Sequence, residues 1–407
     1  MRRSRSALLL VGALGLIGIG AIVAITLLVA PLPEGTQDAS RDAPVIRIAG
    51  PEEVVYDWSR HRCADDDIPD ISARAFRDFR GRVHLLASHD VTRPLIGRSL
   101  DDVVHRCRKV FDSDHDPDPA HYDFREWLNA PYTVNGRQVF ALVHEEYHGQ
   151  GDPRGCPSGS NVKCWLNAVT LAVSNDGGRT FGHARPPAHL VASIPYRYVP
   201  EVGPIGVFSP SNIVRRDDGY FYSLLNVNRY RDQPGGACLA RTRDLSDPRS
   251  WRAWGGESFS VSFVDPYRGG KPSPRHLCRP VSPEVIGGMT QSLTYNTQLE
   301  KFLLVGTSVF FDSAKGRDVP GIYYAVSDDL IRWQGRRLLA EVELISTFRC
   351  GDRSPAVYPS LLDPRSESRN FETTGRRPYL YFVRFHNKAC EQTLDRDLVR
   401  IPVEISE

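Results

Sequence analysis

The chain has 407 residues, of which 41% are hydrophobic and 25% charged, and its formal net charge at pH 7 is +2. A nearly neutral chain lacks the basic excess of a nucleic-acid-binding surface, so no nucleic-acid partner is expected. The length beyond residue 50 exceeds one ordinary hydrophobic core, which predicts either two domains or one large repetitive β-architecture.

The N-terminus carries a long apolar run at residues 7–30, preceded by Arg2, Arg3 and Arg5. A helix of this length spans a bilayer, and its basic flank stays in the cytoplasm. The sequence therefore predicts a single-pass signal-anchor in the cell membrane with the C-terminal domain outside the cytoplasm. A cleaved signal peptide, which gives a secreted protein, is the alternative. The predicted order is a basic stub at 1–6, a transmembrane segment at 7–30, a Pro-rich linker at 31–50 and a β-domain at 51–407.

Disulfides are expected because a chain exported past a membrane carries eight cysteines, at positions 63, 107, 156, 164, 238, 278, 350 and 390. Pairing in sequential order is the simplest connectivity. Cys156 and Cys164 give it local support because they bracket a short loop. A cysteine–zinc site is not expected, since no CxxC spacing occurs.

Pairs of apolar strands joined by turn residues recur five times along the chain, at 70–87, 129–143, 209–225, 290–306 and 357–383. A third strand follows three of them, at 169–173, 237–241 and 321–326, and each runs into an Asp-containing turn and then an aromatic residue. Helical periodicity is nearly absent, with 101–109 as a modest candidate. Repeated small antiparallel sheets predict an all-β fold, a five-bladed β-propeller.

The second hairpin has the strongest local signals. Asn135-Gly136 predicts a two-residue type I′ turn between strands at 130–134 and 138–143, because both central residues of that turn need φ > 0. A polar run, His144–His148, follows the second strand. The hairpin is therefore expected to deliver acids and imidazoles at its open end.

Several motifs resemble known propellers. Ser174–Phe181 resembles the Asp-box of sialidases, which is a structural blade turn, and Ser327–Trp333 and Trp127–Pro131 are similar to segments of five-bladed propeller glycoside hydrolases such as arabinanases, xylosidases and fructosidases. This resemblance implies a glycan partner and hydrolysis by two carboxyl groups, one as acid and one ionised. The family's base is an Asp that opens the first blade, where this chain has Asp70. The Asp that usually follows the W-A-P segment is replaced here by Tyr132.

Strand starts and strand ends at one face of a propeller line a common pocket, which defines the candidate site. The catalytic residues are predicted to be Asp70 with Glu145 or Glu146, of which strand alternation points only one inward. The family's acid is a Glu of the third blade, for which Glu201 is the nearby candidate. The predicted substrate-binding residues are His89, Asp90, Asn129, His144, Asn226, Asn228, Arg384 and His386. No cofactor is predicted, and structural calcium is left open for the acidic loop 112–118.

Two other functions compete with a glycosidase. One is a non-catalytic carbohydrate- or protein-binding propeller of the cell envelope. The other, less favoured, is a zinc metallopeptidase, because His144–His148 matches H-E-x-x-H. That motif needs a helix, whereas the preceding Asn-Gly turn and apolar run favour a strand, in which the two imidazoles lie about 13 Å apart.

Overall fold

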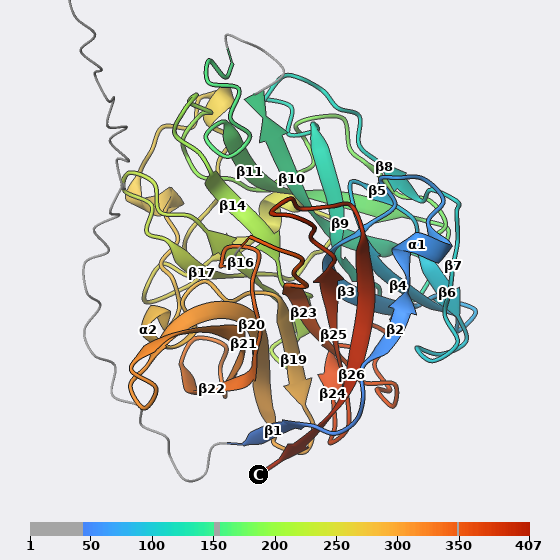
Figure 1. Cartoon of the computed structure of the whole chain (residues 1–407). Helices are drawn as coiled ribbons and strands as arrows, with labels where there is room; N and C mark the ends of the chain where they lie inside the picture. Colours follow the sequence, from blue (N-terminus) through green and yellow to red (C-terminus); the bar gives the residue numbers. More distant parts are fainter. Residues whose placement is uncertain (1–43, 150–154, 348–349) are drawn as a thin grey trace, which may run out of the picture. The chain divides into compact units, whose positions relative to one another are not determined.

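The computed structural model describes residues 44–149, 155–347 and 350–407. These residues form strands and loops almost throughout, which confirms the predicted all-β class (Figure 1). Helical segments are short, namely α1 (Trp58–His61), α2 (Pro283–Ile286) and 3-10 turns at Pro248–Ser250, Pro266–Arg268 and Pro274–His276. Residues 7–30 lie outside the described residues. Within the described ranges, no helix has the length and apolarity needed to cross a membrane.

Most strands belong to five antiparallel sheets, named here by their first strands. The β3 sheet contains β3 (Pro69–Arg77), β4 (Val83–Ser88), β6 (Leu95–Gly97) and β7 (Val104–His105). The β9 sheet contains β9 (Arg125–Tyr132), β10 (Val139–His148), β11 (Trp165–Ser174), β12 (Gly182–His183) and β13 (Leu190–Ala192). The β14 sheet contains β14 (Ile205–Pro210), β15 (Val214–Arg215), β16 (Phe221–Val227), β17 (Gly236–Thr242) and β18 (Arg252–Ala253).

The two remaining sheets come from the last third of the chain. The β19 sheet contains β19 (Ser292–Asn296), β20 (Lys301–Asp312), β21 (Arg317–Ser327), β22 (Trp333–Glu341) and β24 (Thr373–Thr374). The β23 sheet contains β23 (Ala356–Leu362), β25 (Tyr379–Phe385), β26 (Arg396–Ser406) and the N-terminal strands β1 (Val45–Ile48) and β2 (Glu53–Tyr56). A small separate pair joins β5 (Val91–Thr92) and β8 (Phe111–Asp112). All five predicted hairpins and all three predicted third strands are found in these sheets.

Each sheet buries both of its faces against its neighbours. In β4, Leu85 packs in a cluster shared with the β23 sheet, whereas the next residue, Leu86, packs in a cluster shared with the β9 sheet. In β20, Leu304 faces the β14 sheet, and its neighbours Leu303 and Val305 face the β23 sheet. Because successive side chains point to opposite faces of a strand, burial of both faces requires continuous apolar runs. This explains why the second strand of each hairpin shows no polar alternation.

The first strands of the sheets contact one another in a closed cycle. β3 contacts β9, β9 contacts β14, β15 contacts β19, β19 contacts β23, and β23 contacts β3. The cycle is completed where the two ends of the chain meet, because β1 and β2 pair antiparallel with β26 (Figure 1). Val45–Ile48, at the end of the predicted linker, thus forms a paired strand.

The second hairpin differs from its predicted form. Of Asn135 and Gly136, only Gly136 takes a positive φ, +75°, so the predicted type I′ turn is wrong. The Asn135 side chain instead accepts hydrogen bonds from the backbone N–H groups of Arg137 and Gln138, both at 2.9 Å, which makes an Asx turn within a longer loop. The predicted end of the second strand at residue 143 is also wrong, because β10 continues to His148. Likewise, the helix considered for 101–109 is wrong, since this segment contains β7.

Candidate functional site

The polar run at the end of β10 is a strand paired with both β9 and β11. His144 and His148 share one face of it, as i and i+4 residues of a strand, and each has its own partner. His144 Nε2 lies 2.8 Å from Asn167 Oδ1, and His148 Nε2 lies 2.9 Å from Glu146 Oε2. The metallopeptidase prediction is wrong, because its two imidazoles converge on one metal only in a helix.

Strand alternation separates the two candidate acids. Glu146 lies on the same face as the histidines, with Oε1 3.7 Å from His144 Nδ1, and its side chain is 12% exposed. Glu145 points to the opposite face and is buried between the β9 and β3 sheets. Glu146 is therefore the acid that joins the histidines, and Glu145 belongs to a separate environment.

Asp70, at the start of β3, approaches the same group of side chains. Its Oδ2 accepts a hydrogen bond from Trp127 Nε1 at 3.2 Å, and its Oδ1 forms an ion pair with Arg396. The Trp127 ring packs against His144, with centroids 5.9 Å apart. Asp70 and Glu146 thus approach one Trp–His pair from different sheets.

Tyr358, in β23, also lies beside both carboxylates. Burial raises the pKa of Tyr358 well above its usual range, and the charges of Asp70 and, more weakly, Glu146 add to the effect. The phenol is therefore a permanent hydrogen-bond donor. Tyr358 has φ = +55°, a sparsely populated conformation for a bulky residue that is found most often at functional sites.

His89 and Asp90 extend this group beyond the end of β4. His89 Nε2 accepts a hydrogen bond from Arg125 Nη2 at 2.9 Å and lies 3.7 Å from Asp70 Oδ2, while its Nδ1 contacts Asp90. Arg125 Nε donates to Asp90 Oδ2 at 2.7 Å. Burial alone would raise the pKa of Asp90, but His89 and Arg125 outweigh it and lower that pKa below the usual range. Asp90 therefore stays ionised and orients His89.

We call this group the central site, formed by Asp70, His89, Asp90, Arg125, Trp127, His144, Glu146, His148, Tyr358 and Arg396. Sequence reasoning placed Asp70, His89, Asp90, His144 and Glu146 in one site, and the structure brings them together. It missed Arg125 and Trp127, which stand just before the predicted strand, and Arg396, which is 326 residues away from Asp70. Ser209, another predicted strand start, lies at the margin, with Oγ 3.2 Å from His144 Nδ1.

The other predicted site residues have different surroundings. Asn129 is buried in β9, and its Oδ1 has no hydrogen-bond partner within the described ranges. Asn228 donates to Pro204 O at 2.9 Å, and Asn226 lies beside Gly288. Among the described residues, no hydrogen bond or ion pair joins these three asparagines to Asp70 or Glu146.

The basic residues predicted from the last hairpin are engaged elsewhere. Arg384 forms an ion pair with Glu52, and His386 Nε2 lies 2.9 Å from Asp397 Oδ2. Glu201 accepts a hydrogen bond from Ser158 N at 2.9 Å, which lowers its pKa, the opposite of what a general acid needs. None of the three contributes a contact to the central site in the described part of the chain.

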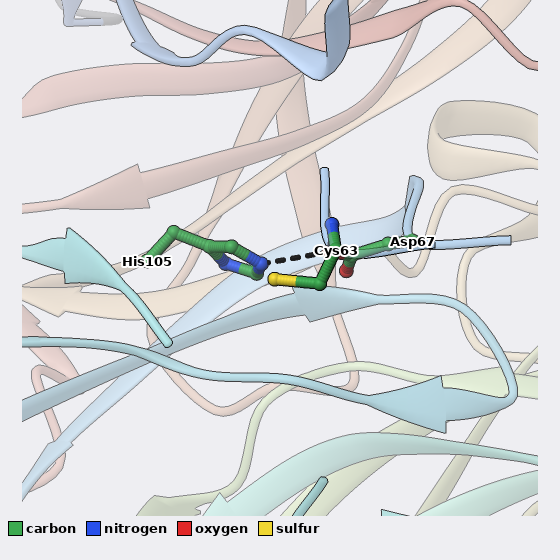
Figure 2. A group of neighbouring side chains, drawn as sticks. All are labelled: Cys63, Asp67 and His105. Atoms are coloured by element: carbon green, nitrogen blue, oxygen red, sulfur yellow. Dashed lines mark hydrogen bonds and ion pairs between the residues drawn. The ribbon is translucent and has the colours of Figure 1, made fainter. Parts of the chain in front are cut away.

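The predicted sequential disulfides are confirmed, as Cys63–Cys107, Cys156–Cys164, Cys238–Cys278 and Cys350–Cys390. They also account for one group of potential metal ligands, shown in Figure 2, in which Cys63 lies beside Asp67 and His105. His105 Nε2 is 2.8 Å from Asp67 Oδ2, and Cys63 has no thiolate to offer while it is oxidised. The group in Figure 2 is thus an ion pair beside a disulfide.

The acidic loop considered for calcium forms local ion pairs. Asp112 lies 2.8 Å from Lys109 Nζ, and Asp116 lies 2.7 Å from His121 Nδ1. Calcium takes six to eight oxygen ligands, and these two carboxylates are each turned toward a cation of the chain itself.

Comparison with known proteins gives structural neighbours only. A scan of known protein families finds no match, and neither does a search of curated protein sequences. Among solved structures, the chain is similar to a glycosyl hydrolase from Bacteroides ovatus (TM-score 0.46, 11% identity, covering 86% of this chain and 85% of that chain). It is also similar to a thermostable family-43 glycoside hydrolase (0.44, 11%, 83% and 93%) and to an endo-arabinase from Bacteroides thetaiotaomicron (0.44, 13%, 84% and 97%). The expected resemblance to glycoside hydrolases is confirmed, and at these values it carries no statement about activity.

Proposed function

We propose that the chain is a membrane-anchored, extracytoplasmic five-bladed β-propeller that binds a glycan at the central site and hydrolyses a glycosidic bond there. The observation that carries this proposal is the approach of Asp70 and Glu146, from different sheets, to the same Trp127–His144 pair. Two carboxyl groups that flank one substrate position are the requirement for glycoside hydrolysis.

The propeller part of the proposal is supported by five sheets whose first strands contact one another cyclically. The Ser174–Phe181 turn supports it too, because Asp176 accepts hydrogen bonds from the backbone N–H groups of Arg179 and Thr180, as an Asp-box requires. The extracytoplasmic location is supported by the apolar run at 7–30 and by four disulfides, which persist in oxidising compartments.

The proposed roles follow from the partners of each side chain. Asp70, paired with Arg396, supplies the carboxylate that attacks or activates water. Glu146, hydrogen-bonded to His148, supplies the proton to the leaving oxygen. The Trp127 ring offers an apolar face for a sugar ring, and Tyr358 offers a hydroxyl donor.

A non-catalytic glycan-binding propeller is the second candidate. It is favoured by the fact that both carboxylates are already engaged, Asp70 by Arg396 and Trp127, and Glu146 by His148. In that case the central site recognises a glycan without cleaving it.

Cleavage assays on the purified full-length chain separate the two candidates. A panel of envelope and plant polysaccharides is screened for release of reducing ends, and Asp70→Asn and Glu146→Gln are each expected to lower cleavage at least about 100-fold. The control, Glu201→Gln, makes the same chemical change in an exposed loop and is expected to keep full activity. Cleavage that persists in both variants would exclude this carboxyl pair. Binding without cleavage by the unmodified chain would favour the second candidate.

A further inference from the structure

A second acidic group lies on the other face of the β9 sheet, where this sheet meets the β3 sheet. We call it the acid–histidine cluster, formed by Asp114, Asp123, Glu126 and His183. Asp114 and Asp123 belong to the loop between β8 and β9, Glu126 to β9, and His183 to β12. Ligand atoms of Asp114, Asp123 and His183 all lie within 4.8 Å of one another. His183 Nε2 is 3.4 Å from Asp123 Oδ1 and 3.6 Å from Glu126 Oε2.

The carboxylates of this cluster are buried and incompletely paired. Glu126 is 0% and Asp123 is 3% exposed. Thr170 Oγ1 donates to Glu126 Oε1 at 3.1 Å, but Glu126 Oε2 and Asp123 Oδ1 have no hydrogen-bond partner within the described part of the chain. An unpaired carboxylate oxygen away from water costs several kcal/mol, so a positively charged partner is needed.

The imidazole of His183 is prepared to act as a ligand. Its Nδ1 lies 2.9 Å from the backbone oxygen of Ala184, and because a carbonyl only accepts, Nδ1 must carry the hydrogen. In the neutral ring, Nε2 then presents a lone pair toward two carboxylate oxygens. A second-shell bond of this kind, from the far nitrogen to a backbone carbonyl, is typical of metal-bound histidines.

Two electron-rich groups facing a lone pair repel one another unless a cation lies between them. The surroundings favour such a charge strongly, since Asp123 first and then Glu126 raise the pKa of His183 to about 9 against the effect of burial. A proton on Nε2 is one candidate for the cation. However, charged N–H···O bonds are normally about 2.7–2.9 Å long, and both separations here are longer.

The separations fit a metal ion better. Ligand bonds of about 2.0–2.2 Å in a tetrahedron place neighbouring ligand atoms roughly 3.3–3.6 Å apart. Imidazole nitrogen together with carboxylate oxygens suits transition metals better than Ca²⁺ or Mg²⁺, which prefer oxygen alone. We propose that Asp114, Asp123, Glu126 and His183 bind a divalent transition-metal ion with the coordination preferences of Zn²⁺.

Such an ion fastens the 113–124 loop to β9 and β12. Asp123 and Glu126 bracket the start of β9, and Arg125 and Trp127 leave the same stretch toward the opposite face, where they contact Asp90 and Asp70. The metal therefore has a positioning role for the central site without belonging to it. Its presence does not depend on whether the central site cleaves or only binds.

The test measures metal content rather than activity. The purified full-length chain is stripped with a chelator, incubated with Zn²⁺ and dialysed, and retained zinc is measured by mass spectrometry. We expect one ion per chain and a higher Tm with the ion bound. His183→Gln and Asp123→Asn are expected to weaken retention at least about tenfold. The control His121→Gln removes a partly exposed imidazole from the same loop and is expected to retain the ion.

Two outcomes overturn the proposal. If the unmodified chain retains no zinc, the cluster is an imidazolium–carboxylate network held by a proton. If His183→Gln retains as much zinc as the unmodified chain, the ion is bound elsewhere. Should the variants fail to fold, Co²⁺ added to the unmodified chain replaces them as the test. Four-coordinate Co²⁺ absorbs strongly in the visible, whereas a weak six-coordinate spectrum contradicts the proposed ligand set.

Discussion

Trp127 carries two functions that depend on different parts of one side chain. Its indole N–H donates to Asp70, and its ring packs beside His144 and in T-shaped contact with His89. The donor orients a carboxylate, while the ring supplies apolar surface at the only partly exposed centre of the site. A residue with both features contributes to catalysis and binding in separable ways.

The prediction at this residue compares Trp127→Phe with Trp127→Ala. The phenylalanine keeps an aromatic face and is expected to bind glycan within about threefold of the unmodified chain, whereas alanine loses the stacking surface and is expected to bind about tenfold more weakly. Calorimetric titration with a glycan from the cleavage panel measures both. Equal affinity in all three proteins would remove Trp127 from the binding surface.

His84 illustrates how burial of one imidazole couples stability to pH. It is fully buried, stacked on Phe76, with Nε2 3.4 Å from Asp78 Oδ2. Burial lowers the pKa of His84, and the charges of Arg82 and Arg179 lower it further, against the effect of Asp78. The unfolded chain therefore binds a proton near pH 6.5 that the folded chain binds only at lower pH.

The free energy of unfolding is thus expected to fall as pH drops below about 6.5, by at most about 1.4 kcal/mol per pH unit from this one group. Urea unfolding at about pH 5 and about pH 7 measures the slope. His84→Gln is expected to flatten it, whereas His115→Gln, an exposed imidazole, is expected to leave it unchanged. A slope that His84→Gln does not alter would assign the effect to another group.

At the scale of single elements, the turns after the third strands share one hydrogen-bond scheme. Asp176 accepts from Ser174 Oγ and from the backbone of residues 179 and 180, and Asp329 accepts from Ser327 Oγ and from the backbone of residues 331 and 332. The carboxylate thus replaces the backbone partners that a tight turn leaves unsatisfied.

Replacement of either carboxylate by alanine, Asp176→Ala or Asp329→Ala, is expected to destabilise the chain by about 1–3 kcal/mol. Asp217→Ala, in an exposed turn, is the matched control and is expected to change stability by less than about 0.5 kcal/mol. Chemical denaturation measures all three. A loss in the control as large as in the turn variants would show that the carboxylate scheme has no special weight.

The strands were predictable from the sequence because burial of both faces leaves long apolar runs, as in β10, β16, β20 and β25. The details that failed depend on partners in other segments. The run from His144 to His148 stays extended because β11 pairs with it residue by residue, and Asn135 avoids positive φ because its side chain binds the following backbone. Neither effect is visible within the hairpin sequence alone.

The central site was predictable only in part, for a related reason. A repeated strand pattern identifies which strand ends converge, and this placed Asp70, His89 and Glu146 together. It does not identify residues that enter from another sheet, such as Arg396, nor does it show that Arg384 is occupied by Glu52.

At the scale of the whole molecule, β26 is the strand on which closure depends, since it pairs with β25, β1 and β2. Glu53–Arg400 and Glu52–Arg384 ion pairs reinforce the same junction. Truncation before residue 396 is therefore expected to abolish the cooperative thermal transition, because three strands lose their partner. A chain extended at its C-terminus by a short tag is the control and is expected to melt as the unmodified chain does. A cooperative transition in the truncated chain, followed by near-ultraviolet circular dichroism, would contradict a requirement for closure.

This junction also sets the order of events during synthesis. Glu53 and its partner Arg400 are 347 residues apart, so at ribosomal rates of about 5–20 residues per second β2 waits roughly 20–70 s for the strand that completes it. Throughout that interval the first strands present open edges, which are templates for wrong pairing. The sheet that contains the earliest strands of the domain is consequently the last to be finished, and the nascent chain depends on protection of those edges for as long as its own translation lasts.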